Sequence, residues 1–225
     1  MPLILSLETA TANCSVALAS DGKILASRSI NVGFSHAEKI NIFIQEVLVE
    51  AGLALSDLQA IAVSSGPGSY TGLRIGVSSA KGLCYALAIP LIAVSTLDAM
   101  AQGINADKDK LIVPMIDARR MEAYCAIYDS SKKRLSVPEA IIIDQKFYAQ
   151  FRTSNNLLLA GDGADKCKTL FQTTTSIKIQ EAFMPQAEFV AILAEQKFAN
   201  AEFENVSLFE PFYLKEFVPG PKKVG

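Results

Sequence analysis

The stretch Ser64-Ser65-Gly66-Pro67-Gly68-Ser69-Tyr70-Thr71-Gly72-Leu73-Arg74-Ile75-Gly76 joins a short apolar run at 61–63 to a helical pattern that continues to 88. Its glycines and proline predict a tight loop, where the backbone takes a positive φ or closely approaches another group. A loop between a strand and a helix is a common place for an anion or for a second backbone. The alternative is a tight turn without a ligand, and both interpretations are open at this point.

The helix expected at 71–88 carries a small residue at every fourth position, namely Gly72, Gly76 and Ala80. This spacing leaves a flat stripe that another backbone can approach, either inside the molecule or across an interface. Because each helical glycine costs about 1 kcal/mol relative to alanine, the stripe needs a packing reason. The loop also lacks the lysine of a phosphate-binding P-loop. We therefore interpret it chiefly as the hinge that presents a partner-binding helix.

Upstream of the loop, the pattern predicts three antiparallel strands and one helix. The strands are expected at 3–7, 14–19 and 23–30, with the turn pair Asp21-Gly22 between the second and third. The helix is expected at 36–51.

The helix expected at 36–51 has capping residues at both ends and apolar residues on two faces. Ser35 and Glu38 predict a capping box at its start, and Gly52 ends it. Its main apolar stripe is expected to face the sheet. Ile42 and Val49 lie a heptad apart on the opposite face, where a partner helix could cover them. Single exposed apolar residues are also common, so an ordinary surface is the alternative interpretation.

The chain downstream of the polar stretch at 103–110 repeats the pattern of the first half. An apolar strand at 111–116 ends in an acid, Asp117, as the first strand ends in Glu8. Each half reads βββαβαβα, which indicates a duplicated unit. The expected fold is α/β, a duplicated ribonuclease H-like fold of the kind found in actin, sugar kinases and Hsp70 ATPases. We expect lobes at 1–106 and 107–216 and a flexible tail at 217–225.

Such a fold places the acid-bearing turns of both halves at a cleft between the lobes. The residues that could grip a nucleotide there are Glu8, Thr9, Thr11, Asp117, Arg119, Gly161, Asp162 and Gly163. Backbone amides and hydroxyls can line phosphate oxygens, and a carboxylate can position magnesium-bound water. However, the turn at 10–13 has no glycine and the turn at 118–121 is bulky. The sequence therefore favours a degenerate nucleotide cleft, and an ATP-dependent phosphotransferase is the alternative.

Composition limits the partners and the location of the protein. The 225 residues carry a net charge of −2, so the whole chain has no basic footprint for nucleic acid. Four dispersed cysteines indicate buried, reduced thiols rather than disulfides or a zinc site. We find neither a signal peptide nor a membrane-spanning segment, and we expect a cytoplasmic protein.

Several motifs together resemble the TsaB (YeaZ) family. They are the N-terminal strand with its acidic hairpin, the helix start at 36–38, the glycine-loop run at 65–76, the Asp117-Ala118-Arg119 turn and the stretch at 210–215. The similarity spans about residues 3–215, and the glycine-loop run is its most specific part.

This resemblance implies a non-catalytic scaffold or activating subunit in the biosynthesis of threonylcarbamoyladenosine at tRNA position 37. Such a subunit forms a heterodimer with TsaD, helps to recruit TsaE, meets tRNA through the complex and forms a homodimer when isolated. It has no activity alone and binds no cofactor by itself, although ATP or ADP can act in the complex. The implied interface consists of His36, Ile42, Val49, Tyr70, Gly72, Arg74, Gly76 and Ala80.

A peptidase or a metal centre is the least favoured interpretation. Metal-dependent members of this superfamily hold their ion with two helical histidines four residues apart. Here His36 is the only histidine, and Ile40 stands four residues later. The sequence therefore predicts no metal site and no base for a serine or cysteine triad.

Overall fold

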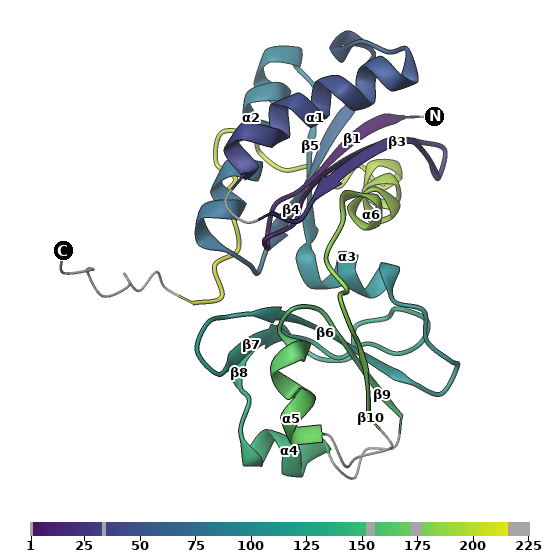
Figure 1. Ribbon diagram of the computed structural model, residues 1–225. Coiled ribbons are helices and arrows are strands. Elements are labelled where there is room, and N and C mark those ends of the chain that lie inside the picture. Colours follow the sequence, from purple (N-terminus) through teal and green to yellow (C-terminus); the bar gives the residue numbers. More distant parts are fainter. Residues whose placement is uncertain (1, 33–34, 152–155, 172–176, 216–225) are drawn as a thin grey trace, which may run out of the picture.

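The computed structural model describes residues 2–32, 35–151, 156–171 and 177–215. These residues form two five-stranded sheets that lie in separate lobes, one above the other in Figure 1. The predicted tail at 217–225 lies outside the described residues.

The first sheet has the strand order β3-β2-β1-β4-β5. Its central strand β1 pairs antiparallel with β2 and parallel with β4. The strands are β1 (Leu3–Glu8), β2 (Cys14–Ser20), β3 (Lys23–Ile30), β4 (Ala60–Gly66) and β5 (Leu91–Ser95). The α-helices of this half are α1 (His36–Ala51), α2 (Tyr70–Leu87) and α3 (Thr96–Gly103), with a short 3-10 turn at Leu55–Asp57.

The second sheet repeats this topology with the order β10-β9-β6-β7-β8. Its central strand β6 pairs antiparallel with β7 and parallel with β9. The strands are β6 (Leu111–Asp117), β7 (Glu122–Cys125), β8 (Glu139–Ile142), β9 (Leu157–Ala160) and β10 (Ile177–Gln180). The helices are α4 (Gln145–Phe151), a 3-10 turn at Ala164–Cys167, α5 (Lys168–Phe171) and α6 (Ala187–Ala199). The predicted duplication of a βββαβαβα unit is confirmed.

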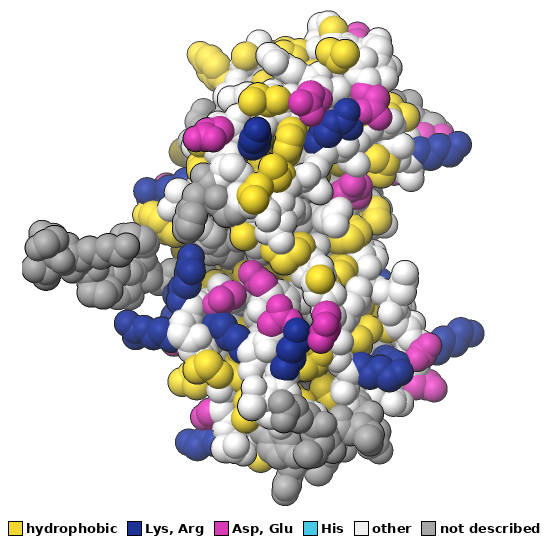
Figure 2. All heavy atoms as spheres, viewed as in Figure 1, with side chains coloured by type: hydrophobic (Ala, Val, Ile, Leu, Met, Phe, Trp, Pro, Cys, Tyr) yellow, Lys and Arg dark blue, Asp and Glu magenta, His cyan; other side chains and the backbone are white. Residues whose placement is uncertain are grey.

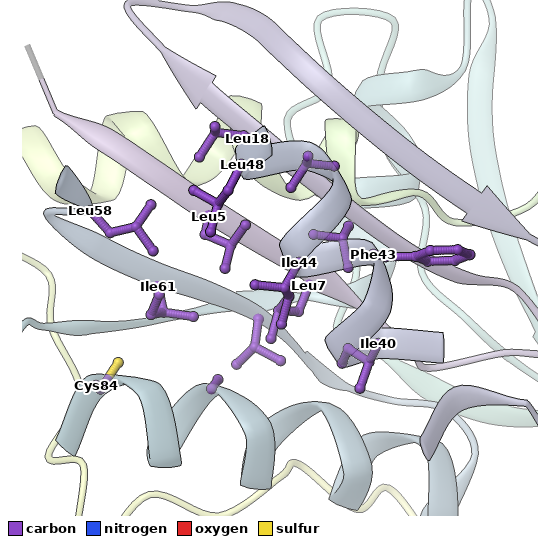
Figure 3. Close-up of a cluster of buried hydrophobic side chains, with 14 of the residues drawn as sticks. Leu5, Leu7, Leu18, Ile40, Phe43, Ile44, Leu48, Leu58, Ile61 and Cys84 are labelled. Carbon is purple, nitrogen blue, oxygen red and sulfur yellow. The ribbon is translucent and has the colours of Figure 1, made fainter. Parts of the chain in front are cut away.

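The two faces of the first sheet are covered by different helices. Alternate residues of β1 point to opposite faces, so that Leu5 and Leu7 join the core under α1 and α2 (Figure 3), whereas Ile4 packs with Val190 and Ala194 of α6. Both α1 and α2 contribute an apolar stripe to the first of these cores, as their periodicity predicts.

The last helix of each half packs against the sheet of the other half. Helix α6 covers the first sheet, and α3 contributes Leu97, Met100 and Ala101 to the core on the second sheet. Figure 1 shows α3 between the two sheets. The sheets fall on either side of the predicted boundary at 106–107, but these two helices pack across it. Sequence alone could not reveal this exchange, because the apolar stripe of a helix does not specify which sheet covers it.

Side-chain caps begin α2 and α3, but not α1 or α6. Ser95 caps α3 by accepting a hydrogen bond from the amide of Asp98 at 3.3 Å. At α1 the predicted capping box is wrong, because the Ser35 hydroxyl instead donates to the carbonyl of Val32 at 3.0 Å.

Candidate functional site

The small-residue stripe on α2 receives the turn between β1 and β2 of the same chain. A Cβ atom at Gly72 would collide with the carbonyl oxygen of Thr9, and one at Gly76 would collide with the Thr9 hydroxyl. That hydroxyl donates a hydrogen bond to the Gly72 carbonyl at 2.8 Å. The glycines of the stripe therefore allow α2 to lie against the β1–β2 turn. Of the two approaches that the sequence left open, this is the one inside the molecule.

The glycine loop itself is fixed at both ends by other parts of the chain. The Ser69 amide donates to the Ala10 carbonyl at 2.7 Å, and the Phe212 amide donates to the Ser65 carbonyl at 2.7 Å. Gly66 has a φ of 112° and leaves room for the carbonyl of Phe212. The loop is thus a structural junction, and its glycines contact protein backbone.

Glu8, the first candidate for ordering magnesium-bound water, is completely buried. Its carboxylate accepts hydrogen bonds from the Ser64 hydroxyl at 2.5 Å and from the Ala10 amide at 2.6 Å. Burial raises its pKa from the ordinary 4.5 to about 7, although these hydrogen bonds oppose the shift. The carboxyl group is therefore enclosed within the first lobe.

The other polar residues of the same turn also have partners within the chain. Thr11 is buried, and its carbonyl accepts a hydrogen bond from Nε2 of His36 at 2.8 Å. The Asn13 amide group donates to the Pro185 carbonyl at 2.8 Å. The only histidine of the chain thus fixes the start of α1 to the β1–β2 turn, and its buried ring does not reach the surface as an interface residue.

In the second lobe, the acid at the end of β6 already has a lysine as its ion-pair partner. Asp117 forms an ion pair with Lys166 at 2.5 Å, and its carboxylate also accepts the Arg119 amide at 2.6 Å. Asp162 accepts the Asp117 amide at 2.9 Å, and burial raises the pKa of Asp162 above its ordinary value. The predicted residues Asp117, Arg119 and Asp162 are therefore brought together, but their polar groups bond mainly to one another.

The glycine turn after β9 also packs against protein. Gly161 has a φ of 115°, and a Cβ there would collide with the carbonyl of Met115. A Cβ at Gly163 would lie 2.9 Å from the carbonyl carbon of Ile116. Both glycines allow this turn to pack closely onto β6.

The predicted interface residues divide into exposed and buried groups. Ile42, Val49 and Arg74 are exposed and Tyr70 is half-buried, whereas His36, Gly72, Gly76 and Ala80 are buried. The last four are packed inside this chain, and the partner interface itself stays a prediction. The cause of this packing is the orientation of α2, which directs its glycine stripe toward Thr9.

The surface of α2 that faces away from the sheet is centred on residues that the sequence reasoning did not select. Thr71, Ser78, Gly82 and Tyr85 are all exposed, and Tyr85 is 85% exposed. No atom lies within 4 Å of a Cβ built at Gly82, in contrast to Gly72 and Gly76. Nothing in the described residues therefore requires a glycine here, although glycine destabilises a helix. The 3.6-residue period could have identified this arc if the buried face had been assigned first.

The segment that follows α6 runs back along α2 and reaches the second lobe (yellow in Figure 1). Nζ of Lys81 donates to the Phe209 carbonyl at 2.9 Å, and Tyr213 packs on Tyr70 with ring centroids 4.9 Å apart. Lys215 then forms an ion pair with Glu122 of β7. We call residues 204–215 the C-terminal strap. It borders a hollow of about 270 Å³ against α2.

No group of three or more histidine, cysteine or acidic side chains in the described residues could hold a metal ion. No helix in these parts of the chain has the length and hydropathy needed to cross a membrane.

Residues 31–218 match the family model of TsaD, described as tRNA N6-adenosine threonylcarbamoyltransferase. The tRNA threonylcarbamoyladenosine biosynthesis protein TsaB of Escherichia coli K12 is 32% identical, over 99% of this chain and 98% of that protein.

Solved structures agree with these sequence matches. A Pseudomonas aeruginosa protein described as similar to peptidase YEAZ superposes with a TM-score of 0.81 and 28% identity, over 96% of this chain and all of that one. The activator of 2-hydroxyisocaproyl-CoA dehydratase from Clostridium difficile, solved with bound ADPNP, has a TM-score of 0.50 and 14% identity, over 90% of this chain and 98% of that one. The second likeness concerns the fold alone, and with the repeated topology it confirms the predicted actin-like class. The chain belongs to the wider family that the TsaD model describes and, within it, to the TsaB (YeaZ) family.

Proposed function

We propose that this chain is a non-catalytic, activating subunit of the machinery that makes threonylcarbamoyladenosine at tRNA position 37. The observation that carries the proposal is the closure of both cleft turns by the chain itself. Thr9 is packed against α2, and Asp117 is paired with Lys166. A phosphotransferase would need these groups open to a nucleotide and its magnesium ion. The chain retains the two-lobed fold, while its β1–β2 and β6–β7 turns bond to other parts of the same chain.

The docking partner in this proposal is a TsaD subunit, and the docking surface is the exposed side of α1 and α2. Val49 is 79% exposed, Ile42 is 45% exposed, and Gly82 leaves space for a close backbone approach. Large exposed apolar side chains beside an unfilled glycine are typical of a helix-to-helix interface. In isolation the same surface pairs two copies of this chain. TsaE joins the assembled pair, and ATP or ADP acts in that complex.

The test is co-purification of the full chain with its cognate TsaD. Val49→Lys and Gly82→Lys place a charge on the proposed surface and should each abolish the complex while the folded monomer remains. Val137→Lys is the matched control, because Val137 is 69% exposed on the second lobe. Retention of the complex by both surface variants would overturn the assignment of this surface. Equal loss in the control variant would contradict it as well.

A further inference from the structure

Two adjacent arginines form the tip of the β6–β7 hairpin in an unusual backbone conformation. Arg119 has a φ of 70° and Arg120 a φ of 50°, the left-handed region that asparagine and glycine normally occupy at such turns. Both side chains are exposed. Holding non-glycine residues in this region costs of the order of 1 kcal/mol each, so a glycine would suit the turn better. The hairpin thus keeps two arginines at the expense of its own stability.

The described residues offer these guanidinium groups no counter-charge. The nearby acids are engaged elsewhere, because Asp117 pairs with Lys166 and Glu122 pairs with Lys215. The structure records neither an ion pair nor a side-chain hydrogen bond for Arg119 or Arg120 among these residues. Meanwhile the Arg119 amide is fixed by the Asp117 carboxylate at 2.6 Å. A rigid turn therefore presents two unpaired cations to solvent.

The C-terminal strap brings further cationic and aromatic groups toward this tip. Lys215 contacts Glu122, which follows the turn directly, and Tyr213 lies two residues earlier, within about 7 Å along the chain. Nε of Arg74 donates a hydrogen bond to the Tyr213 hydroxyl at 3.3 Å. The same guanidinium lies 4.1 Å from the ring centre of Tyr70. Figure 2 shows Lys and Arg side chains near the junction of the lobes at the left of the view, with acidic groups beside them.

We propose that Arg119 and Arg120 bind the phosphate backbone of an RNA strand, which continues along the strap toward Tyr213 and Arg74. Guanidinium groups bind phosphate oxygens through paired hydrogen bonds, and aromatic and arginine side chains stack on bases. Arg74 is exposed beside the half-buried rings of Tyr70 and Tyr213. The inference rests on the proposed function, since that function brings a tRNA to the complex. It assigns the RNA to the lobe junction, including Arg74 at the start of α2, and leaves Ile42, Val49 and Gly82 to the surface that docks the protein partner. The local cations compensate for a chain whose net charge is −2.

The test is titration of an unmodified tRNA transcript with the full chain between about 50 and 200 mM salt, the range in which phosphate contacts dominate affinity. The variant is Arg119→Glu with Arg120→Glu. Its matched control is Lys23→Glu with Lys146→Glu, which changes the net charge equally at two exposed lysines elsewhere. We expect the arginine variant to lose at least tenfold in affinity, and the slope of log affinity against log salt to fall by about 1.5. The control should change less than threefold.

A second variant separates binding from folding. Arg119→Gly with Arg120→Gly relieves the left-handed strain, so the hairpin should become more stable while RNA binding weakens. Wild-type affinity in both arginine variants, or equal loss in the lysine control, would overturn the inference. Loss of TsaD co-purification by the arginine variants would assign the tip to protein docking instead. Because the titration uses this chain alone, its result stands whether or not Val49→Lys disrupts the heterodimer.

Discussion

Gly72 and Gly82 lie in the same helix but face opposite surroundings. A side chain at Gly72 would meet the backbone of Thr9, which cannot rotate away, whereas Gly82 faces open space. Gly72→Ala should therefore destabilise the fold by about 3 kcal/mol through overpacking. Gly82→Ala should stabilise it by about 1 kcal/mol through helix propensity. Urea unfolding of both variants measures the difference, and similar effects of the two changes would contradict this account of the glycines.

Glu8 gives the stability a pH dependence of unusual sign. Its pKa is about 7 in the folded chain against 4.5 ordinarily, so above pH 4.5 the unfolded state releases a proton that the folded state keeps. The free energy of unfolding should fall as pH rises from about 4.5 to 7, by up to about 3 kcal/mol, and then stay level. Glu8→Gln should remove this contribution, which urea unfolding at pH 5 and pH 8 measures. An unchanged pH dependence in the variant would show that Glu8 is ionised at little cost.

At the scale of elements, the periodic patterns predicted the first four strands, α1, α2 and β6 within a few residues of their observed positions. The reason is local, because alternation and the 3.6-residue period record which side chains are buried. The orientation of α2 was harder to predict, since a stripe of glycines fits an internal turn and a partner equally well. Only the position of Thr9 decides between them. Likewise, the Asp117–Lys166 pair joins two segments that no local pattern connects.

The C-terminal strap is an element with a specific attachment point at Lys81. Nζ of Lys81 donates to the carbonyls of Ser207 and Phe209, at 3.3 and 2.9 Å. Lys81→Met should loosen the strap, and the Phe212 amide, bonded to Ser65, should exchange its hydrogen about tenfold faster. Lys39→Met on α1 is the control. Equal protection of Phe212 in the Lys81 variant and the wild type would show that the apolar contacts alone hold the strap.

For the whole molecule, the state of the β1–β2 and β6–β7 turns predicts how the isolated chain responds to nucleotide. Buried Glu8 and neutralised Asp117 leave no free carboxylate for magnesium-bound water at either predicted site. Calorimetry with magnesium-ATP should therefore detect no binding by the chain alone. Saturable binding, together with its loss in Asp117→Asn, would restore the ATP-dependent phosphotransferase as the better interpretation.

A reconstituted tRNA modification assay shows whether this chain acts as an accessory subunit. The assay contains the cognate TsaD, TsaE, ATP, a threonylcarbamoyl donor and unmodified tRNA, with or without this chain. We expect modification only when the chain is added, none by the chain alone, and none with the folded Val49→Lys variant. Full modification without the chain, or modification by the chain alone, would contradict this role.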